Sequence, residues 1–152
     1  MRDRADVKVL PPILLAAALG AGSATAALFP VRLLPTGAAI TIGLGAIAAS
    51  LVLVGFAFRE IHRAKTAFDV RKPTTAIVTT GVFRFTRNPV YLSMMLLYVG
   101  AAFLANLPWT LLLAIPTGSV LCMAAIKPEE RYLDAKFGDD YRAYRARTPR
   151  WI

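Results

Sequence analysis

Arg87-Asn88-Pro89-Val90-Tyr91 stands where a polar segment gives way to an apolar run, and the fold can be worked out from this corner. Pro89 fixes its own φ at about −65° and keeps Asn88 out of the helical region, so we expect a helix to begin here. Arg87 then lies just outside the apolar run, and Tyr91 lies about one turn inside the helix. The corner therefore predicts a polar group at the mouth of an apolar helix.

The chain is too apolar for a typical soluble domain of its size. Of its 152 residues 57% are hydrophobic, and the mean hydropathy is +0.54. Long uncharged runs rather than scattered apolar residues account for this value. We therefore expect one all-α integral membrane domain with four transmembrane helices, a cytoplasmic loop at 59–89 and a cytoplasmic tail at 127–152. The four predicted spans cover residues 10–29, 36–58, 90–107 and 109–126.

The tail has the pattern of an amphipathic helical segment rather than of a span. Its apolar and aromatic residues recur at helical spacing and share one face, whereas the other face is charged. We expect Gly138 to break the helix and Asp139 to cap a second one. The residues of the shared face are Leu133, Phe137, Tyr141 and Tyr144.

The formal net charge of +9 follows a membrane pattern and argues against nucleic-acid binding. Three Lys and Arg residues precede the first run, seven lie in the 59–89 loop and seven in the tail. The short turn at 30–35 carries one such residue, and the turn at 105–108 carries none. This bias predicts a multi-pass protein with both termini in the cytoplasm, embedded in the inner membrane in the case of a bacterium.

Few residues could carry chemistry. The predicted spans hold no Asp, Glu, Lys, Arg or His, which weighs against a proton-coupled transporter. His62 is the single histidine, and no Cys, His and carboxylate set has ligand spacing, so we predict no metal site. The Arg87–Tyr91 corner and the pair Glu129-Glu130 remain. A plain alternative is that Arg87 is an interfacial anchor and that the two glutamates favour a helix N-terminus.

Two stretches in order resemble one protein superfamily. The segment Ile77–Leu92, which ends in Arg-Asn-Pro-Val-Tyr-Leu, resembles the signature of the isoprenylcysteine carboxyl methyltransferase and phospholipid methyltransferase superfamily. The tail is similar to the second signature of that superfamily, in the pieces Glu129–Leu133, Phe137–Tyr141 with Tyr144, and Pro149–Trp151. Together the two signatures cover about residues 60–152.

The resemblance implies an integral membrane methyltransferase that uses S-adenosylmethionine. It also implies a cofactor site beneath the C-terminal segment, with Arg87 and Glu130 in catalytic roles. On this basis one wall comprises Arg87, Asn88, Pro89, Tyr91 and Leu92, the opposite wall Glu129 and Glu130, and the lid Tyr141, Tyr144 and Arg150.

The acceptor is less constrained than the donor. The prenylcysteine branch has His where Asn88 stands and Gly where Ser93 stands, so a lipid or another hydrophobic acceptor gains over an isoprenylcysteine-like carboxylate. We expect the acceptor of this protein to enter the site from the bilayer. Two rivals stay open, an NADPH-dependent reductase of the sterol-reductase type and a non-catalytic four-span protein. Small residues in the first two runs would also permit a homodimer.

Overall fold

The computed structural model describes residues 9–66 and 74–152, and within these ranges the chain is all-α. Arg2, Arg4 and Lys8 of the N-terminal segment and Arg71 and Lys72 of the loop lie outside the described residues. The helices are α1 (Pro11–Leu28), α2 (Thr36–Arg63), a 3₁₀ helix (Gly81–Arg84), α3 (Pro89–Leu104), α4 (Pro108–Leu121), a π-helical turn (Cys122–Ile126), α5 (Lys127–Phe137) and α6 (Asp139–Arg147).

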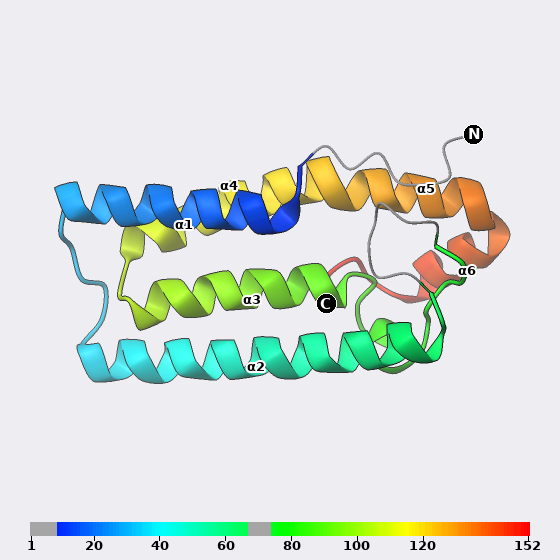
Figure 1. Ribbon diagram of the computed structural model, residues 1–152, viewed down its shortest axis with the longest axis horizontal. Helices are drawn as coiled ribbons and strands as arrows, with labels where there is room; N and C mark the ends of the chain where they lie inside the picture. The colour runs from blue at the N-terminus through cyan, green and yellow to red at the C-terminus, as the bar shows by residue number, and fades with distance from the viewer. Residues whose placement is uncertain (1–8, 67–73) are drawn as a thin grey trace.

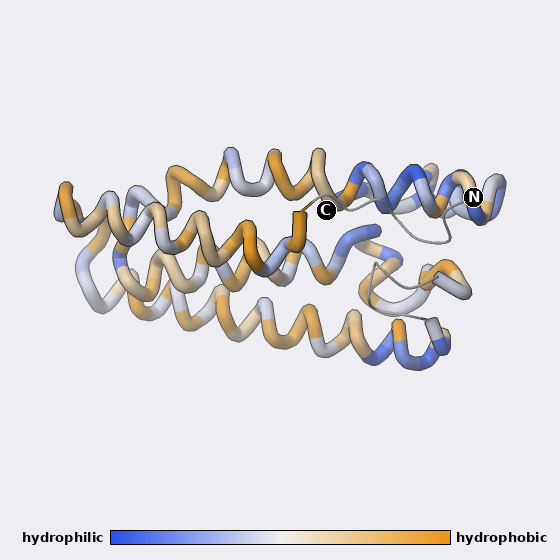
Figure 2. Tube along the Cα trace, turned by 45° about the horizontal axis from the view of Figure 1, so that its top comes forward, coloured by the Kyte–Doolittle hydropathy of each residue, from blue (hydrophilic) through white to orange (hydrophobic). Residues whose placement is uncertain are grey.

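The four long helices lie along one another and form an elongated bundle (Figure 1). The turns between α1 and α2 and between α3 and α4 lie at one end. The described part of the loop, together with α5 and α6, lies at the other end. Hydrophobic residues follow the length of the bundle, whereas hydrophilic residues collect at the end that carries α5 and α6 (Figure 2). The predicted loop and tail therefore share one end of the molecule.

Three helices are long and apolar enough to cross a membrane, and they support a membrane protein. They are Pro11–Leu28, Thr36–Arg63 and the continuous helix Pro108–Phe137. The remaining apolar helix, α3, has 16 residues and is shorter than the usual crossing of about 20 residues. The count of four spans stays a prediction.

Two boundaries differ from the expected ones. The second helix does not end at residue 58 but continues to Arg63, and this extension carries Glu60. The fourth helix does not stop at 126 either, because it continues through the π-helical turn into α5. Pro128 explains the wide turn, since its ring would crowd the carbonyl four residues earlier in a regular α-helix.

The break within the tail is confirmed, but the expected cap is wrong. Gly138 separates α5 from α6 and has a φ of +54°, a conformation that glycine adopts without strain. Asp139 is the first residue of α6 and makes no capping hydrogen bond. Its carboxylate instead pairs with Arg142, at 2.9 Å.

The helices pack through glycines at two crossings. A Cβ on Gly43 would lie 2.6 Å from the backbone nitrogen of Leu104 and 2.9 Å from the carbonyl oxygen of Gly100. A Cβ on Gly22 would lie 2.7 Å from the Cα of Thr110. Close approach of backbones is the usual mode of helix packing in membranes. Accordingly, α3 packs most extensively on α2, and α4 packs most extensively on α1.

The side chain of Asn106 joins the two turns at one end of the bundle. Asn106 has a φ of +53° and lies two residues after the end of α3. Its Oδ1 accepts the backbone N–H of Leu33 at 3.1 Å, and its Nδ2 donates to the carbonyl of Leu34 at 2.7 Å. The turn after α1 is thereby bound to the turn after α3, which fixes the two hairpins relative to each other.

We predict that Gly43→Ala destabilises the bundle because its methyl group would meet backbone atoms that have no room to move. Overpacking of this kind costs about 1–3 kcal/mol. The matched control is Gly45→Ala on the same helix, where a Cβ meets nothing within 4 Å. Thermal unfolding in detergent should show a lower Tm for the first variant alone. Equal Tm values would contradict the close contact between α2 and α3.

Candidate functional site

The Arg87–Tyr91 corner forms the start of α3 as expected. Asn88 is the last residue before the helix, with φ −127°, and Pro89 is its first residue. The side chain of Asn88 does not cap the helix; its Nδ2 donates to the backbone carbonyl of Arg150 at 3.0 Å. The N–H of Arg87 donates to the carbonyl of Pro149 at 3.0 Å. Hydrogen bonds to the backbone carbonyls of Pro149 and Arg150 thus hold the C-terminal segment against the corner. This contact covers the start of α3.

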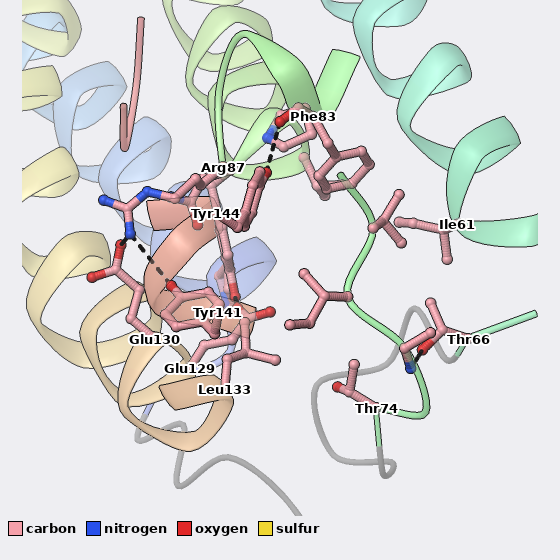
Figure 3. Close-up of a pocket in the computed structure, with 18 of the residues that line it drawn as sticks. Ile61, Thr66, Thr74, Phe83, Arg87, Glu129, Glu130, Leu133, Tyr141 and Tyr144 are labelled. Atoms are coloured by element: carbon pink, nitrogen blue, oxygen red, sulfur yellow. Dashed lines mark hydrogen bonds and ion pairs between the residues drawn. The ribbon is translucent and has the colours of Figure 1, made fainter. Parts of the chain in front are cut away.

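Arg87 is buried, with its side chain 9% exposed, and its partners come from two other helices. Its Nη1 lies 3.1 Å from Oε1 of Glu130 and donates to the Tyr141 hydroxyl at 3.3 Å (Figure 3). Among the residues that the structure describes, none accepts a hydrogen bond from the buried Nε of Arg87. A buried donor without a partner is costly, so this N–H marks a place where a ligand can accept a hydrogen bond.

Glu130 is engaged on both of its oxygens. Oε1 accepts from Nε of Arg150 at 3.0 Å and pairs with Arg87, while Oε2 accepts from Nη2 of Arg150 at 2.7 Å. The bidentate Arg150 pair is the geometry that gives strong, oriented charge-assisted hydrogen bonds. The hydrogen bond to Glu130 raises the pKa of Arg150 above its ordinary value. Glu130 therefore holds two guanidinium groups in place.

Glu129 has different partners from its neighbour Glu130. Its Oε2 accepts a hydrogen bond from the Tyr91 hydroxyl at 2.8 Å. Among residues 9–66 and 74–152, no cation lies within ion-pair distance of Glu129 and its Oε1 accepts no hydrogen bond. Both glutamates lie in the first turn of α5, as the plain alternative expected, but α5 continues the helix of α4 without a break.

Two phenols of α6 complete the polar wall. Burial, together with the charge of Glu130, raises the pKa of Tyr141, and burial raises the pKa of Tyr144. Both hydroxyls are therefore neutral donors at physiological pH. The Tyr144 hydroxyl donates to the carbonyl of Phe83 at 2.7 Å, which attaches α6 to the 3₁₀ helix. Tyr141 accepts from Arg87, so its own proton can be donated to another group.

A cavity of about 370 Å³ lies between these groups and the loop, within the size range of small-molecule sites. Of the residues predicted for the site, eight line this cavity: Arg87, Asn88, Pro89, Tyr91, Glu129, Glu130, Tyr141 and Tyr144. Two do not. Arg150 reaches Glu130 from outside the cavity lining, and Leu92 faces a separate groove between α3 and α4.

The far wall of the cavity is apolar and was not anticipated from the sequence. Figure 3 shows Ile61 and the loop residues Thr66 and Thr74 opposite the side chains of α5 and α6. The start of α1 also contributes to this wall. Residue types alone carry no signal for such a wall, because its members come from distant segments. The apolar residues from α1, α2, the loop and α3 that line the cavity are Leu10, Pro11, Pro12, Ile61, Ala76, Ile77, Val78, Phe83, Val90 and Met94.

Glu60 is a second feature that the sequence reasoning missed. It is 6% exposed, it accepts from the Thr80 hydroxyl at 2.6 Å and it pairs with Arg63 at 3.3 Å. Gly81 packs directly on the Glu60 side chain with a φ of +57°. Glu60 thereby fixes the loop that carries Phe83 into the cavity wall. The available signal was the run Thr79-Thr80-Gly81 after a helix that carries Glu60 in its last turn.

The arrangement has the donors and acceptors that a zwitterionic head group requires. The free N–H of Arg87 and the Tyr141 hydroxyl can donate to an anionic group, and the open oxygen of Glu129 can accept from an ammonium group. Among the residues that the structure describes, no set of three His, Cys, Asp or Glu side chains could hold a metal ion. The cavity therefore combines one polar wall of both charges with one apolar wall.

Comparison with known proteins gave one match. The family model that describes phospholipid methyltransferases matches residues 38–140, which is more than half of the chain. The matched segment includes α2, the corner at Arg87 and both glutamates. Neither the search of curated proteins nor the search of solved structures gave a match.

We predict that Glu130→Gln destabilises the protein strongly, because it leaves the buried Arg87 guanidinium without its carboxylate. Removing one partner of a buried ion pair costs about 3–5 kcal/mol. The control is Arg142→Gln, whose pairs with Asp134 and Asp139 are largely exposed and screened by solvent. Unfolding in detergent should separate the two variants clearly, and similar stabilities would show that the buried pair is not structural.

Proposed function

Since the chain belongs to the phospholipid methyltransferase family, we propose that it transfers a methyl group from S-adenosylmethionine to a hydrophobic acceptor delivered by the membrane. The observation that supports this proposal best is a cavity lined by Arg87 and Glu129, whose Nε and Oε1 have no hydrogen-bond partner among the described residues. Arg87 lies just before α3 and Glu129 belongs to α5, so both lie at the end of the bundle that carries α5 and α6 (Figure 1).

The residues present fit the head group of this donor. S-adenosylmethionine carries an α-carboxylate and an α-ammonium group on one carbon. Arg87 and Tyr141 would bind the carboxylate through N–H and O–H donors, and Glu129 would bind the ammonium group. Glu130 would act by holding Arg87 and Arg150 rather than by direct contact.

When bound, the donor supplies an electrophilic methyl group on a sulfonium centre. Because the leaving group is a neutral thioether, its departure needs no general acid. The protein then has to orient the reactants and exclude water. Tyr144 closes the wall through its bond to Phe83, and the C-terminal segment covers the corner at Arg87. A site built mostly from positioning contacts is consistent with this task.

The apolar wall favours a hydrophobic acceptor. Leu10 and Pro11 belong to the start of an apolar helix, and Met94 belongs to α3, so the wall continues into the bundle. Two positions that differ from the prenylcysteine branch have structural roles here. Asn88 binds the carbonyl of Arg150, and the buried Ser93 accepts a hydrogen bond from Ser50 through its carbonyl at 2.7 Å. We therefore favour a lipid over an isoprenylcysteine-like carboxylate.

We also propose that all four apolar helices are embedded, with the loop and tail in the cytoplasm. The shorter α3 lies between longer helices and could span where the bilayer thins locally. The concentration of Lys and Arg in the loop and tail supports this orientation. It places the candidate site at the cytoplasmic interface, where a water-soluble donor and a lipid acceptor can meet.

The first test asks which cofactor the protein binds, S-adenosylmethionine as a methyltransferase would or NADPH as the rival reductase would. S-adenosylmethionine should raise the Tm of the purified protein in detergent, because a ligand at about 100 times its Kd stabilises by about 2.7 kcal/mol. NADPH should leave the Tm unchanged. Transfer of radiolabel from S-adenosylmethionine to a total lipid extract of the host would then identify the acceptor. A shift with NADPH alone would overturn the proposal.

The second test concerns the ammonium contact. Glu129→Gln keeps the acceptor for Tyr91 but loses the charge, so we expect donor affinity to fall about tenfold or more. The control is Asp134→Asn, an acid on the same helix that pairs with Arg142 outside the cavity. Calorimetry should show a weaker Kd for the first variant alone. An unchanged Kd for Glu129→Gln would contradict the assignment.

A further inference from the structure

A second hollow lies on the outside of the bundle, between α3 and the continuous helix of α4 and α5. Its walls are apolar apart from Ser119, whose hydroxyl is satisfied by the carbonyl of Ile115 at 3.0 Å, and Cys122. It opens to the surface, since Ile115 is 77% exposed and Met123 is 58% exposed. We call it the lateral groove; its main lining residues are Leu92, Met95, Ile115, Gly118, Met123 and Trp151.

The lateral groove ends at a guanidinium group. Nη1 of Arg150 donates a hydrogen bond to the sulfur of Cys122, which lines the groove, at 4.0 Å, and Trp151 follows Arg150 in the chain. Nε and Nη2 of Arg150 are bound to Glu130, so Nη1 is directed away from that carboxylate. The Arg150 side chain is 34% exposed. A partly exposed guanidinium group, paired on one side with Glu130, therefore lies at the polar end of an apolar groove.

We infer that the lateral groove binds one anionic phospholipid, with an acyl chain along α3 and α4 and the phosphate on Arg150. The charge of the site selects the head group, because guanidinium groups bind phosphate oxygens through directed N–H donors. The apolar walls and their exposure in a membrane protein select the chain. This lipid is separate from the methyl acceptor, since Tyr91 and Met94 face the cavity whereas Leu92 and Met95 face the groove.

The binding site is tested by native mass spectrometry of the purified protein in detergent, with phosphatidylglycerol and phosphatidylcholine of identical acyl chains. We expect one bound phosphatidylglycerol, retained about tenfold more than phosphatidylcholine, whose phosphate can make the same contact but whose choline group carries a positive charge that Arg150 repels. Equal retention of the two lipids would overturn the inference. Because the assay uses no methyl donor, its result is independent of the proposed reaction.

Two variants locate the lipid. Gly118→Leu fills the groove, where a Cβ meets just the flexible end of Met95 at 3.5 Å, and it should abolish specific retention. Gly20→Leu is the control, because that position is exposed on α1 with nothing within 4 Å. Arg150→Gln should remove the preference for phosphatidylglycerol. Lipid retention by Gly118→Leu, or a protein dimer that this variant alone dissociates, would refute the assignment.

Discussion

A guanidinium and a carboxylate can be buried together at the end of an apolar bundle when each satisfies the other. Arg87 and Glu130 are about nine-tenths buried as side chains, and they join the start of α3 to α5. Isolated burial of either charge would be prohibitive, so the pair requires both segments to be in place at once. The hydrogen bonds around it extend this requirement to α6 through Tyr141 and to the C-terminal segment through Arg150.

The continuous helix of α4 and α5 is what brings Glu130 to Arg87. Its apolar half packs on α1, and its polar half extends beyond the bundle end. The π-helical turn Cys122–Ile126 lies between the two halves, just before Pro128. A wide turn shifts the helical register of all later residues, so it sets the directions in which Glu129 and Glu130 project. The turn is thus part of the geometry of the site.

Much of this arrangement could be predicted from the sequence, because it depends on local signals. The helix start at Pro89, the break at Gly138 and the grouping of loop and tail at one end follow from proline, glycine and charge patterns. Contacts that depend on long-range geometry could not be predicted in this way. Glu60 looked like one more residue of a polar loop, yet it is buried against Thr80 and Gly81.

The same limit applies to the pair of glutamates. Adjacent identical residues look equivalent in a sequence, but consecutive positions on a helix point about 100° apart. Here one side chain faces two arginines and the other faces a phenol and the cavity. Glu130 has used its charge within the protein, so it has little left for a ligand. Glu129 retains a carboxylate oxygen that no described cation neutralises, which makes it the member of the pair suited to a positively charged group.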